Sequence, residues 1–266
     1  MTPSDTPGAA IPAATLVTWR DPPAGSDGLP RILVVERSAQ MAFAAGALVF
    51  PGGRIDAADR DLADALGRPD DAAKISAIRE TIEESAVAPA LTGDVTPALG
   101  LALQQSLIDG APFADLLDAH GLALDLAALV PFARWLPAFH HARTFDTMFF
   151  LARAPAPAPA SATAPAGDWA PRPQPGECVA AEWASPAELI ARIDRGEASA
   201  IFPTRRNLER LARHADFAAA VADANAFAID TITPWIEDID GQRHVCIPDG
   251  RGYPVTREPL DTAFRA

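Results

Sequence analysis

A short segment, AIRETIEESAV at residues 77–87, carries three glutamates close together, namely Glu80, Glu83 and Glu84. At about 100° per residue it reads as an amphipathic helix, with isoleucines on one face and these glutamates on the opposite side. An acidic surface helix is the simplest interpretation. However, like-charged residues three and four positions apart destabilise a helix by a few tenths of a kcal/mol per pair. No lysine four residues further on compensates for them.

Such a cluster becomes favourable when a divalent cation binds among the carboxylates, because hard cations prefer oxygen ligands. The residues upstream favour this second interpretation. An apolar run, ALVF at 47–50, leads into Pro51-Gly52-Gly53, and glycines allow the backbone to approach a ligand closely. A bound metal would neutralise an anionic substrate and activate a water molecule. The pattern therefore indicates metal-assisted attack of water on an anion such as a diphosphate.

The run, the glycines and the helix together resemble the Nudix box, the loop–helix motif of hydrolases that cleave diphosphates linked to another moiety. The resemblance covers residues 50–87. Gly53 corresponds to the opening glycine, and Asp59 stands where the family has its first glutamate. The second block matches residue for residue at Arg79, Glu80, Glu83 and Glu84.

Three further differences separate this chain from the family pattern. Between Arg60 and Ile78 there are 19 residues where the family has seven, so we place an insertion at 60–72. Thr81 replaces an aliphatic residue, and Ala86 replaces a late glycine. None of these changes removes a carboxylate from the second block.

The resemblance implies a fold and a set of roles. The fold is α+β, an α/β/α sandwich around a mixed β-sheet with helical insertions and a C-terminal extension. One or more Mg²⁺ or Mn²⁺ ions would bind Glu80, Glu83, Glu84 and the carbonyl of Gly53. Glu80 would be a ligand or the base that takes a proton from water, and Arg79 would orient the glutamates. A fourth acidic ligand often comes from elsewhere, with Glu177 and Glu182 as the candidates here.

The residues upstream of the box bear on the substrate. RSAQMAFAAGALVFPGG, at 37–53, resembles the motif of coenzyme A diphosphatases, in the branch with the mammalian peroxisomal enzyme and its bacterial relatives. Arg37, Gly46 and the Phe50–Gly53 run match that motif, whereas its second arginine is Ala42 here. CoA or acyl-CoA is thus the first substrate class to consider, with Arg37 binding substrate.

Two alternatives stay open. The missing arginine favours another nucleotide derivative, such as ADP-ribose, a dinucleotide or a nucleotide sugar. Asp59 and Ala86 favour a non-catalytic Nudix ligand-binding module. A replacement phosphate contact is available in Arg206, Arg210 and Arg213, which form a basic stripe on a helix beginning near Thr204; an ordinary solvated face is the competing interpretation.

The remaining elements follow from local patterns. Strands are expected at 15–19, 31–37, 47–50, 144–154 and in ECVAAEW, and helices at 71–87, across the whole of 97–135, in SPAELIARIDRG and in PTRRNLERLARHADF. A polar, Asp-rich loop is expected up to about Asp70, and a Pro/Ala-rich loop at 154–175. We predict one Nudix domain at 13–200, on which the extension 201–266 packs.

Composition limits the partners. The 266 residues carry a formal charge of 22 − 35 = −13, which disfavours broad contact with nucleic acid or an anionic membrane. The two cysteines lie far apart, so reduced thiols are expected. Without a basic, apolar leader at its start, the chain is expected to be cytoplasmic. A small diphosphate is the expected partner, and a homodimer stays open.

Overall fold

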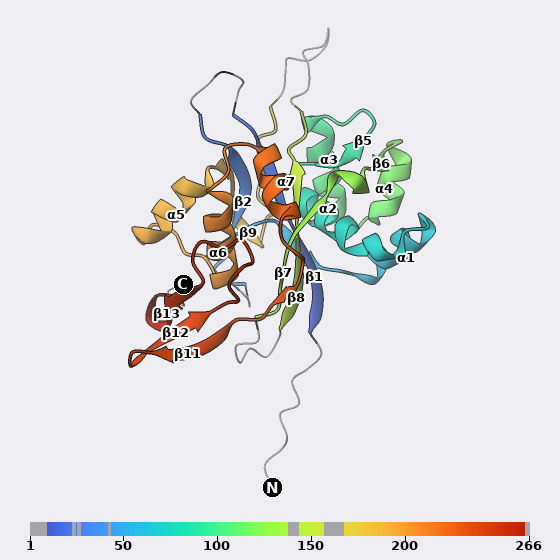
Figure 1. Cartoon of the computed structure of the whole chain (residues 1–266). Helices are drawn as coiled ribbons and strands as arrows, with labels where there is room; N and C mark the ends of the chain where they lie inside the picture. The colour runs from blue at the N-terminus through green and yellow to red at the C-terminus, as the bar shows by residue number, and fades with distance from the viewer. Residues whose placement is uncertain are drawn as a thin grey trace.

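The computed structural model describes residues 10–22, 25, 28–41, 44–137, 144–156 and 168–263. Within these residues, eight strands form one mixed sheet in the order β10-β7-β8-β1-β2-β3, with β4 paired to β1 and β9 paired to β2 (Figure 1). The strands are β1 (Ile11–Arg20), β2 (Arg31–Arg37), β3 (Leu48–Val49), β4 (Gly52–Arg54), β7 (Val130–Trp135), β8 (Phe145–Arg153), β9 (Cys178–Ala184) and β10 (Thr231–Ile232).

Strands β1 and β8 lie side by side at the centre of this sheet. They run parallel, from the pair Ile11–Phe145 to the pair Trp19–Arg153. Residues 13–19 of β1 are all buried, as expected for a strand that is covered on both faces. On its other side β1 pairs antiparallel with β4, which places Gly53 opposite Ala14. The glycine pair is thus fixed to the central strand.

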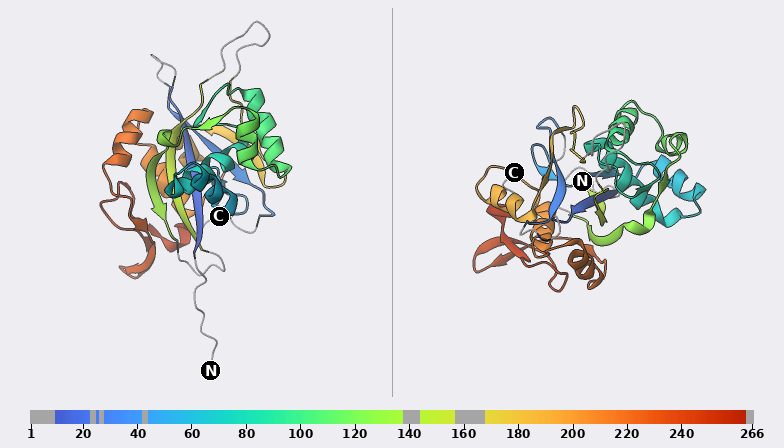
Figure 2. Two further views of the ribbon diagram at one scale, coloured as in Figure 1. Left: turned by 90° about the vertical axis from the view of Figure 1, so that its right-hand side faces the viewer. Right: turned by 90° about the horizontal axis from the view of Figure 1, so that it is seen from above.

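Helices cover both faces of the sheet, because neighbouring residues of β1 point to opposite sides. Leu16 belongs to a core cluster with Ile78 and Ile82, whereas Val17 belongs to another with Leu208. Figures 1 and 2 show helices α1–α4 on one side of the sheet and α5 and α6 on the other. The predicted α/β/α sandwich around a mixed sheet is confirmed.

The first face carries α1 (Ala57–Ala65), α2 (Ala72–Ser85), α3 (Pro97–Ile108) and α4 (Phe113–Ala119). The same part of the chain also forms a two-stranded sheet: β5 (Leu91–Thr92), which precedes α3, pairs with β6 (Ala123–Leu124), which follows α4. The second core cluster takes residues from α5 (Pro186–Asp194), α6 (Phe202–Leu211) and α7 (Phe217–Asn225).

The last part of the chain adds a small sheet of its own. It is a three-stranded sheet in the order β11 (Trp235–Ile239), β12 (Gln242–Cys246) and β13 (Arg257–Pro259). Helix α8 (Leu260–Ala263) follows β13. Tyr253 from this region is buried beside Trp135 of β7, whose indole Nε1 donates a hydrogen bond to the Tyr253 hydroxyl at 3.0 Å. These residues share one core cluster with the central sheet.

The prediction of an Asp-rich loop up to about Asp70 is wrong. This stretch folds as α1 and a 3-10 turn at Pro69–Asp71. At the start of α1 the Asp59 carboxylate accepts a hydrogen bond from the Asp56 backbone N–H at 2.9 Å. Such a bond satisfies a donor that the helix leaves free. The insertion inside the box is therefore largely helical.

The prediction that residues 97–135 are helical throughout is also only partly right. The stretch forms α3 and α4, but it ends as β7, which pairs antiparallel with β8. Helix α3 ends before Gly110, which has a φ of +87°, and Pro112 precedes α4. The last residues, VPFARW, contain a β-branched residue and two aromatic ones, types that favour strands. Tertiary pairing then fixes them in the sheet.

Candidate active site

Helix α2 carries the three glutamates along the edge of its sheet-facing side. Ile78 and Ile82 are fully buried against the sheet. Glu80 and Glu83 are partly exposed, but the Glu84 side chain is only 2% exposed. The helical wheel therefore misplaced Glu84, which is covered by the strand residues that follow Phe50.

Strand β4 approaches the glutamates closely because it consists largely of glycine. The Gly52 backbone N–H donates a hydrogen bond to Glu84 Oε2 at 3.0 Å. A Cβ atom on Gly53 would lie 2.5 Å from the Glu80 carboxylate, and one on Gly52 would lie 2.5 Å from the Ala14 carbonyl oxygen. A Cβ at Gly52 would therefore require the β1 backbone to shift, whereas one at Gly53 would displace the Glu80 carboxylate.

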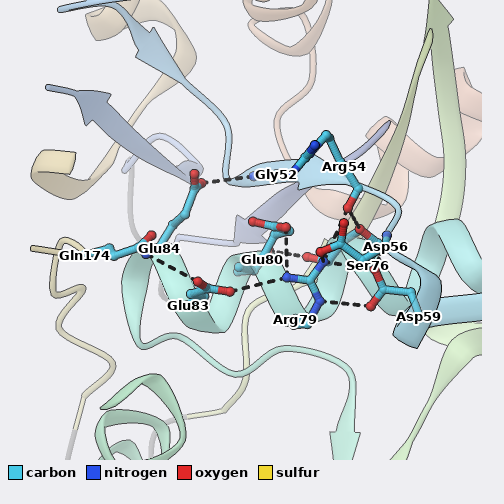
Figure 3. Close-up of polar contacts among 12 residues, drawn as sticks. Gly52, Arg54, Asp56, Asp59, Ser76, Arg79, Glu80, Glu83, Glu84 and Gln174 are labelled. Carbon is cyan, nitrogen blue, oxygen red and sulfur yellow. Dashed lines mark hydrogen bonds and ion pairs between the residues drawn. The ribbon is translucent and has the colours of Figure 1, made fainter. Parts of the chain in front are cut away.

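Arg79 joins the two blocks of the box (Figure 3). Its Nε and Nη2 donate to the two carboxylate oxygens of Asp59, both at 2.9 Å. Its Nη1 lies 2.9 Å from Glu80 Oε1 and 3.3 Å from Glu83 Oε2. Nη2 also reaches the backbone carbonyl of Arg54 at 3.3 Å. A bidentate pair of this kind fixes the plane of the guanidinium, so Asp59 holds Arg79 while Arg79 holds the glutamates.

Asp59 therefore fills the place of the first glutamate of the family pattern. Its carboxylate is 2% exposed and comes from the first turn of α1. Burial alone would lower the pKa of Arg79, but its bond to Asp59 and the nearby charges of Glu80 and Glu83 raise that pKa above its ordinary value. The guanidinium stays charged.

The glutamates occupy an unfavourable electrostatic environment. The pKa of Glu84 is raised to about 8, chiefly by burial and then by repulsion from Glu80. Burial also raises the pKa of Glu80 to about 7, and that of Glu83 is raised for the same reason. Ionising all three carboxylates in one place is costly without added positive charge.

These donors fit a hard divalent cation in type, because they are carboxylate oxygens with excess negative charge. In the described part of the chain, no cluster of three His, Cys, Asp or Glu side chains stands close enough to hold an ion as the side chains lie. Glu80 and Glu83 are turned to Arg79 instead, and Glu84 to Gly52 and Arg37. Binding an ion would require the carboxylates of Glu80 and Glu84 to turn toward that of Glu83.

Of the other residues predicted for the site, some lie near the glutamates and others have different partners. Arg37, at the end of β2, lies beside the glutamates, with Nη1 3.6 Å from Glu84 Oε1. Glu177 is also near, since its charge raises the pKa values of Glu83 and Glu84. Glu182 instead accepts a hydrogen bond from Arg192 at 2.7 Å. Ala42 lies outside the described residues, as do residues 157–167 of the predicted Pro/Ala-rich loop.

Arg206 is not brought to the glutamates. It lies on α6, whose apolar residues pack in the core cluster of the opposite sheet face. Its side chain is 1% exposed and its Nη2 contacts Glu209 Oε1 at 2.8 Å and Glu258 Oε2 at 2.9 Å. Arg210 is likewise buried and bonded to Asp223. The expected stripe of substrate-binding arginines is mostly a set of buried ion pairs.

Two residues at the site gave no signal in the sequence. The Gln174 side-chain amide donates to Glu83 Oε1 at 3.3 Å. The Gln104 amide donates to the backbone carbonyl of Glu83 at 3.0 Å. Both come from segments distant from the box in the sequence, and an isolated glutamine has no diagnostic pattern.

The C-terminal end of α2 explains the late glycine of the family pattern. Ala86 caps the helix in the left-handed region, with a φ of +59°. Glycine reaches this region without a steric penalty, whereas other residues pay about 1–2 kcal/mol. The chain thus keeps the backbone geometry of the motif with a residue less suited to it.

No family model matches the chain. Among solved structures, the crystal structure of a Nudix hydrolase from Alicyclobacillus acidocaldarius is 28% identical, with a TM-score of 0.63. The match covers 80% of this chain and 96% of that one. The chain is thus similar to a Nudix hydrolase over most of its length, in sequence and in fold. Helix α2 of this chain carries all three glutamates of the resemblance.

More distant structures are also similar. The Nudix domain of Shewanella oneidensis NrtR, complexed with ADP ribose, is 14% identical, covering 76% of this chain and 86% of that one with a TM-score of 0.39. A C. elegans Ap4A hydrolase binary complex is 16% identical, covering 71% and 89% with a TM-score of 0.36. Both scores are too low to support an inference about this chain. No helix in the described ranges is long and apolar enough to cross a membrane.

Proposed function

We propose that this chain is a Nudix hydrolase that performs metal-dependent hydrolysis of the diphosphate bond in a nucleoside diphosphate-linked substrate. The observation that carries the proposal is the gathering of Glu80, Glu83 and Glu84 around Arg79 and the Gly52-Gly53 strand, with the pKa values of all three glutamates raised. A surface helix would leave these carboxylates in water, with nothing to raise their pKa values.

Glu80, Glu83 and Glu84 would hold the ion, with the box glycine beside them. A bound Mg²⁺ or Mn²⁺ would supply charge neutralisation for the diphosphate and a more acidic water molecule. Glu80 would be a ligand of this ion or the base that takes a proton from water, and its carboxylate lies beside Gly53 and Arg79. Arg79 keeps the carboxylates oriented.

CoA or acyl-CoA is the proposed first substrate class. Its support is the resemblance of residues 37–53 to the CoA diphosphatase motif, together with the position of Arg37 beside Glu84. A guanidinium there could pair with a phosphate once a cation neutralises Glu84. Another nucleotide derivative remains the second candidate, because Ala42 provides no arginine.

The non-catalytic alternative loses its two supporting observations. Asp59 departs from the pattern, yet it makes the bidentate contact that holds Arg79. Ala86 departs as well, yet it adopts the left-handed conformation that the motif needs. Neither substitution disables the arrangement of the glutamates.

The test is product formation from a panel of CoA, acetyl-CoA, ADP-ribose, NADH, a diadenosine polyphosphate and a UDP-sugar, each with Mg²⁺ or Mn²⁺. Glu83→Gln removes a glutamate of the site, and Glu197→Gln is the matched control on the exposed surface. Release of 3′,5′-ADP and phosphopantetheine, lost only in Glu83→Gln, supports the CoA proposal. Cleavage of another compound keeps the metal chemistry and rejects CoA. No turnover of any compound contradicts the proposal.

A further inference from the structure

Residues 168–178, which we call the strap, lie across the C-terminal end of α2. Trp169 is buried near one end of the strap, and its carbonyl accepts a hydrogen bond from Trp183 Nε1 at 2.7 Å. At the other end, the Cys178 N–H donates to the Gln174 carbonyl at 3.0 Å. The strap is therefore held in place before it enters β9.

The strap satisfies backbone groups that a helix end leaves without partners. The Arg172 N–H donates to the Ser85 carbonyl at 2.8 Å, and the Gln174 N–H to the Glu84 carbonyl at 3.2 Å. The Gln104 side chain, from α3, joins the two segments by donating to the carbonyls of Glu83 and Arg172 at 3.0 and 2.8 Å. These main-chain contacts attach the strap without any help from the Gln174 side chain.

The Gln174 side chain makes a different kind of contact. It is buried, and its amide reaches Glu83 Oε1 at 3.3 Å. The other oxygen of Glu83 contacts Arg79 Nη1, also at 3.3 Å. Glu83 is thus held from two sides, by a residue of its own helix and by a residue 91 positions further along the chain.

The negative charges around Glu83 explain why a neutral partner suits this position. Glu177 lies close enough for its charge to raise the pKa of Glu83. A further carboxylate in place of Gln174 would add repulsion, whereas a neutral amide donates a hydrogen bond to one oxygen and leaves the negative charge available. Partners of this kind commonly fix the orientation of metal ligands.

We propose that Gln174 is a positioning residue, which fixes the Glu83 carboxylate for cation binding. This inference rests on the proposed metal-dependent function. It gives the strap a role in the chemistry, beyond its contribution to the fold, and it places that role in one side-chain hydrogen bond.

The test compares Gln174→Met with Gln104→Met by calorimetric titration of Mn²⁺ into the full-length, metal-free protein, alongside thermal melting. Methionine has a similar length and cannot donate the hydrogen bonds. Gln174→Met is expected to weaken Mn²⁺ binding about 10- to 100-fold with little change in melting temperature. Gln104→Met is expected to lower the melting temperature while leaving Mn²⁺ affinity within about threefold, because only Gln104 joins main-chain groups.

Activity provides a second readout. Excess Mn²⁺ should restore turnover by Gln174→Met, since the defect lies in ion binding, whereas a disrupted fold would not be rescued by the ion. Wild-type Mn²⁺ affinity in Gln174→Met, or an equal loss in both variants, would overturn the inference and leave the proposed function standing. A wild-type protein that binds no Mn²⁺ would instead overturn the metal-dependent function, and this inference with it.

Discussion

Replacing Glu84 by glutamine should stabilise the metal-free protein at high pH while it removes activity. In the native state the pKa of Glu84 is about 8, raised from 4.5 chiefly by burial. Between these two values the folded protein holds a proton that the unfolded chain has released. Stability therefore falls as the pH rises through this window, and it levels off above the native pKa. Glutamine does not titrate, so the variant escapes this loss.

The magnitude follows from the size of the shift. Each unit of pKa corresponds to about 1.4 kcal/mol, so the full shift amounts to about 5 kcal/mol at and above pH 8. Because the charge of Glu80 also raises the pKa of Glu84, the two titrations are coupled and we expect a gain of about 3–5 kcal/mol. For a chain of this size, that raises the melting temperature by about 10 °C. At pH 5 both carboxyls are largely protonated in the native state, and the gain should nearly vanish.

The assay is thermal melting of chelator-treated wild type and Glu84→Gln from pH 5 to pH 8, then with Mn²⁺ added. Metal should stabilise the wild type more than the variant, so the difference between them should shrink or reverse. The control is Glu197→Gln, because Glu197 is exposed and its pKa is lowered by Arg195. Parallel pH profiles for wild type and Glu84→Gln would refute the electrostatic reasoning.

Three further substitutions test the rest of the site. Asp59→Asn should reduce kcat about 10- to 100-fold, because Arg79 loses the partner that fixes its plane; steady-state kinetics measures this. Gly53→Ala should reduce activity with little change in melting temperature, because the new Cβ displaces the movable Glu80 carboxylate rather than backbone. Arg206→Met should lower the free energy of unfolding by about 3–5 kcal/mol, since it removes the Arg206 partner of the buried Glu258 carboxylate; denaturant unfolding should show this, with Mn²⁺ affinity unchanged.

Two of these substitutions have a matched control. Gly52→Ala meets the Ala14 backbone instead, so it should impair folding. Asp56→Asn alters an exposed aspartate near Arg79 and should preserve turnover. Loss of Mn²⁺ binding in Arg206→Met would show that Arg206 contributes to the site after all. Full activity in Asp59→Asn would show that Arg79 does not need Asp59 to fix its orientation.

What the sequence predicts well is local. Arg79, Glu80 and Glu83 share a helix, so their spacing alone brings them together. The Pro-Gly-Gly run correctly indicated close approach of the backbone, and the mixture of strands and helices indicated the α+β class. In each of these cases the deciding contacts are set within a short stretch of chain.

What it predicts poorly depends on distant partners. Helix α1 was missed because its aspartates resemble loop residues, although its capping aspartate was a usable signal. Arg206 looked like part of a solvated stripe because its partner Glu258 lies 52 residues away. Gln174 could not be found at all, since only folding brings it to Glu83.

The separation between Gln174 and Glu83 has a consequence for synthesis on the ribosome. When the box helix has left the ribosome, the strap has yet to be translated, and 91 residues separate the two contacting side chains. At typical elongation rates this delay lasts roughly 5–20 s. During that interval the nascent chain carries the glutamates without the segment that covers the end of their helix. The motif is therefore made early, and its surroundings are completed late.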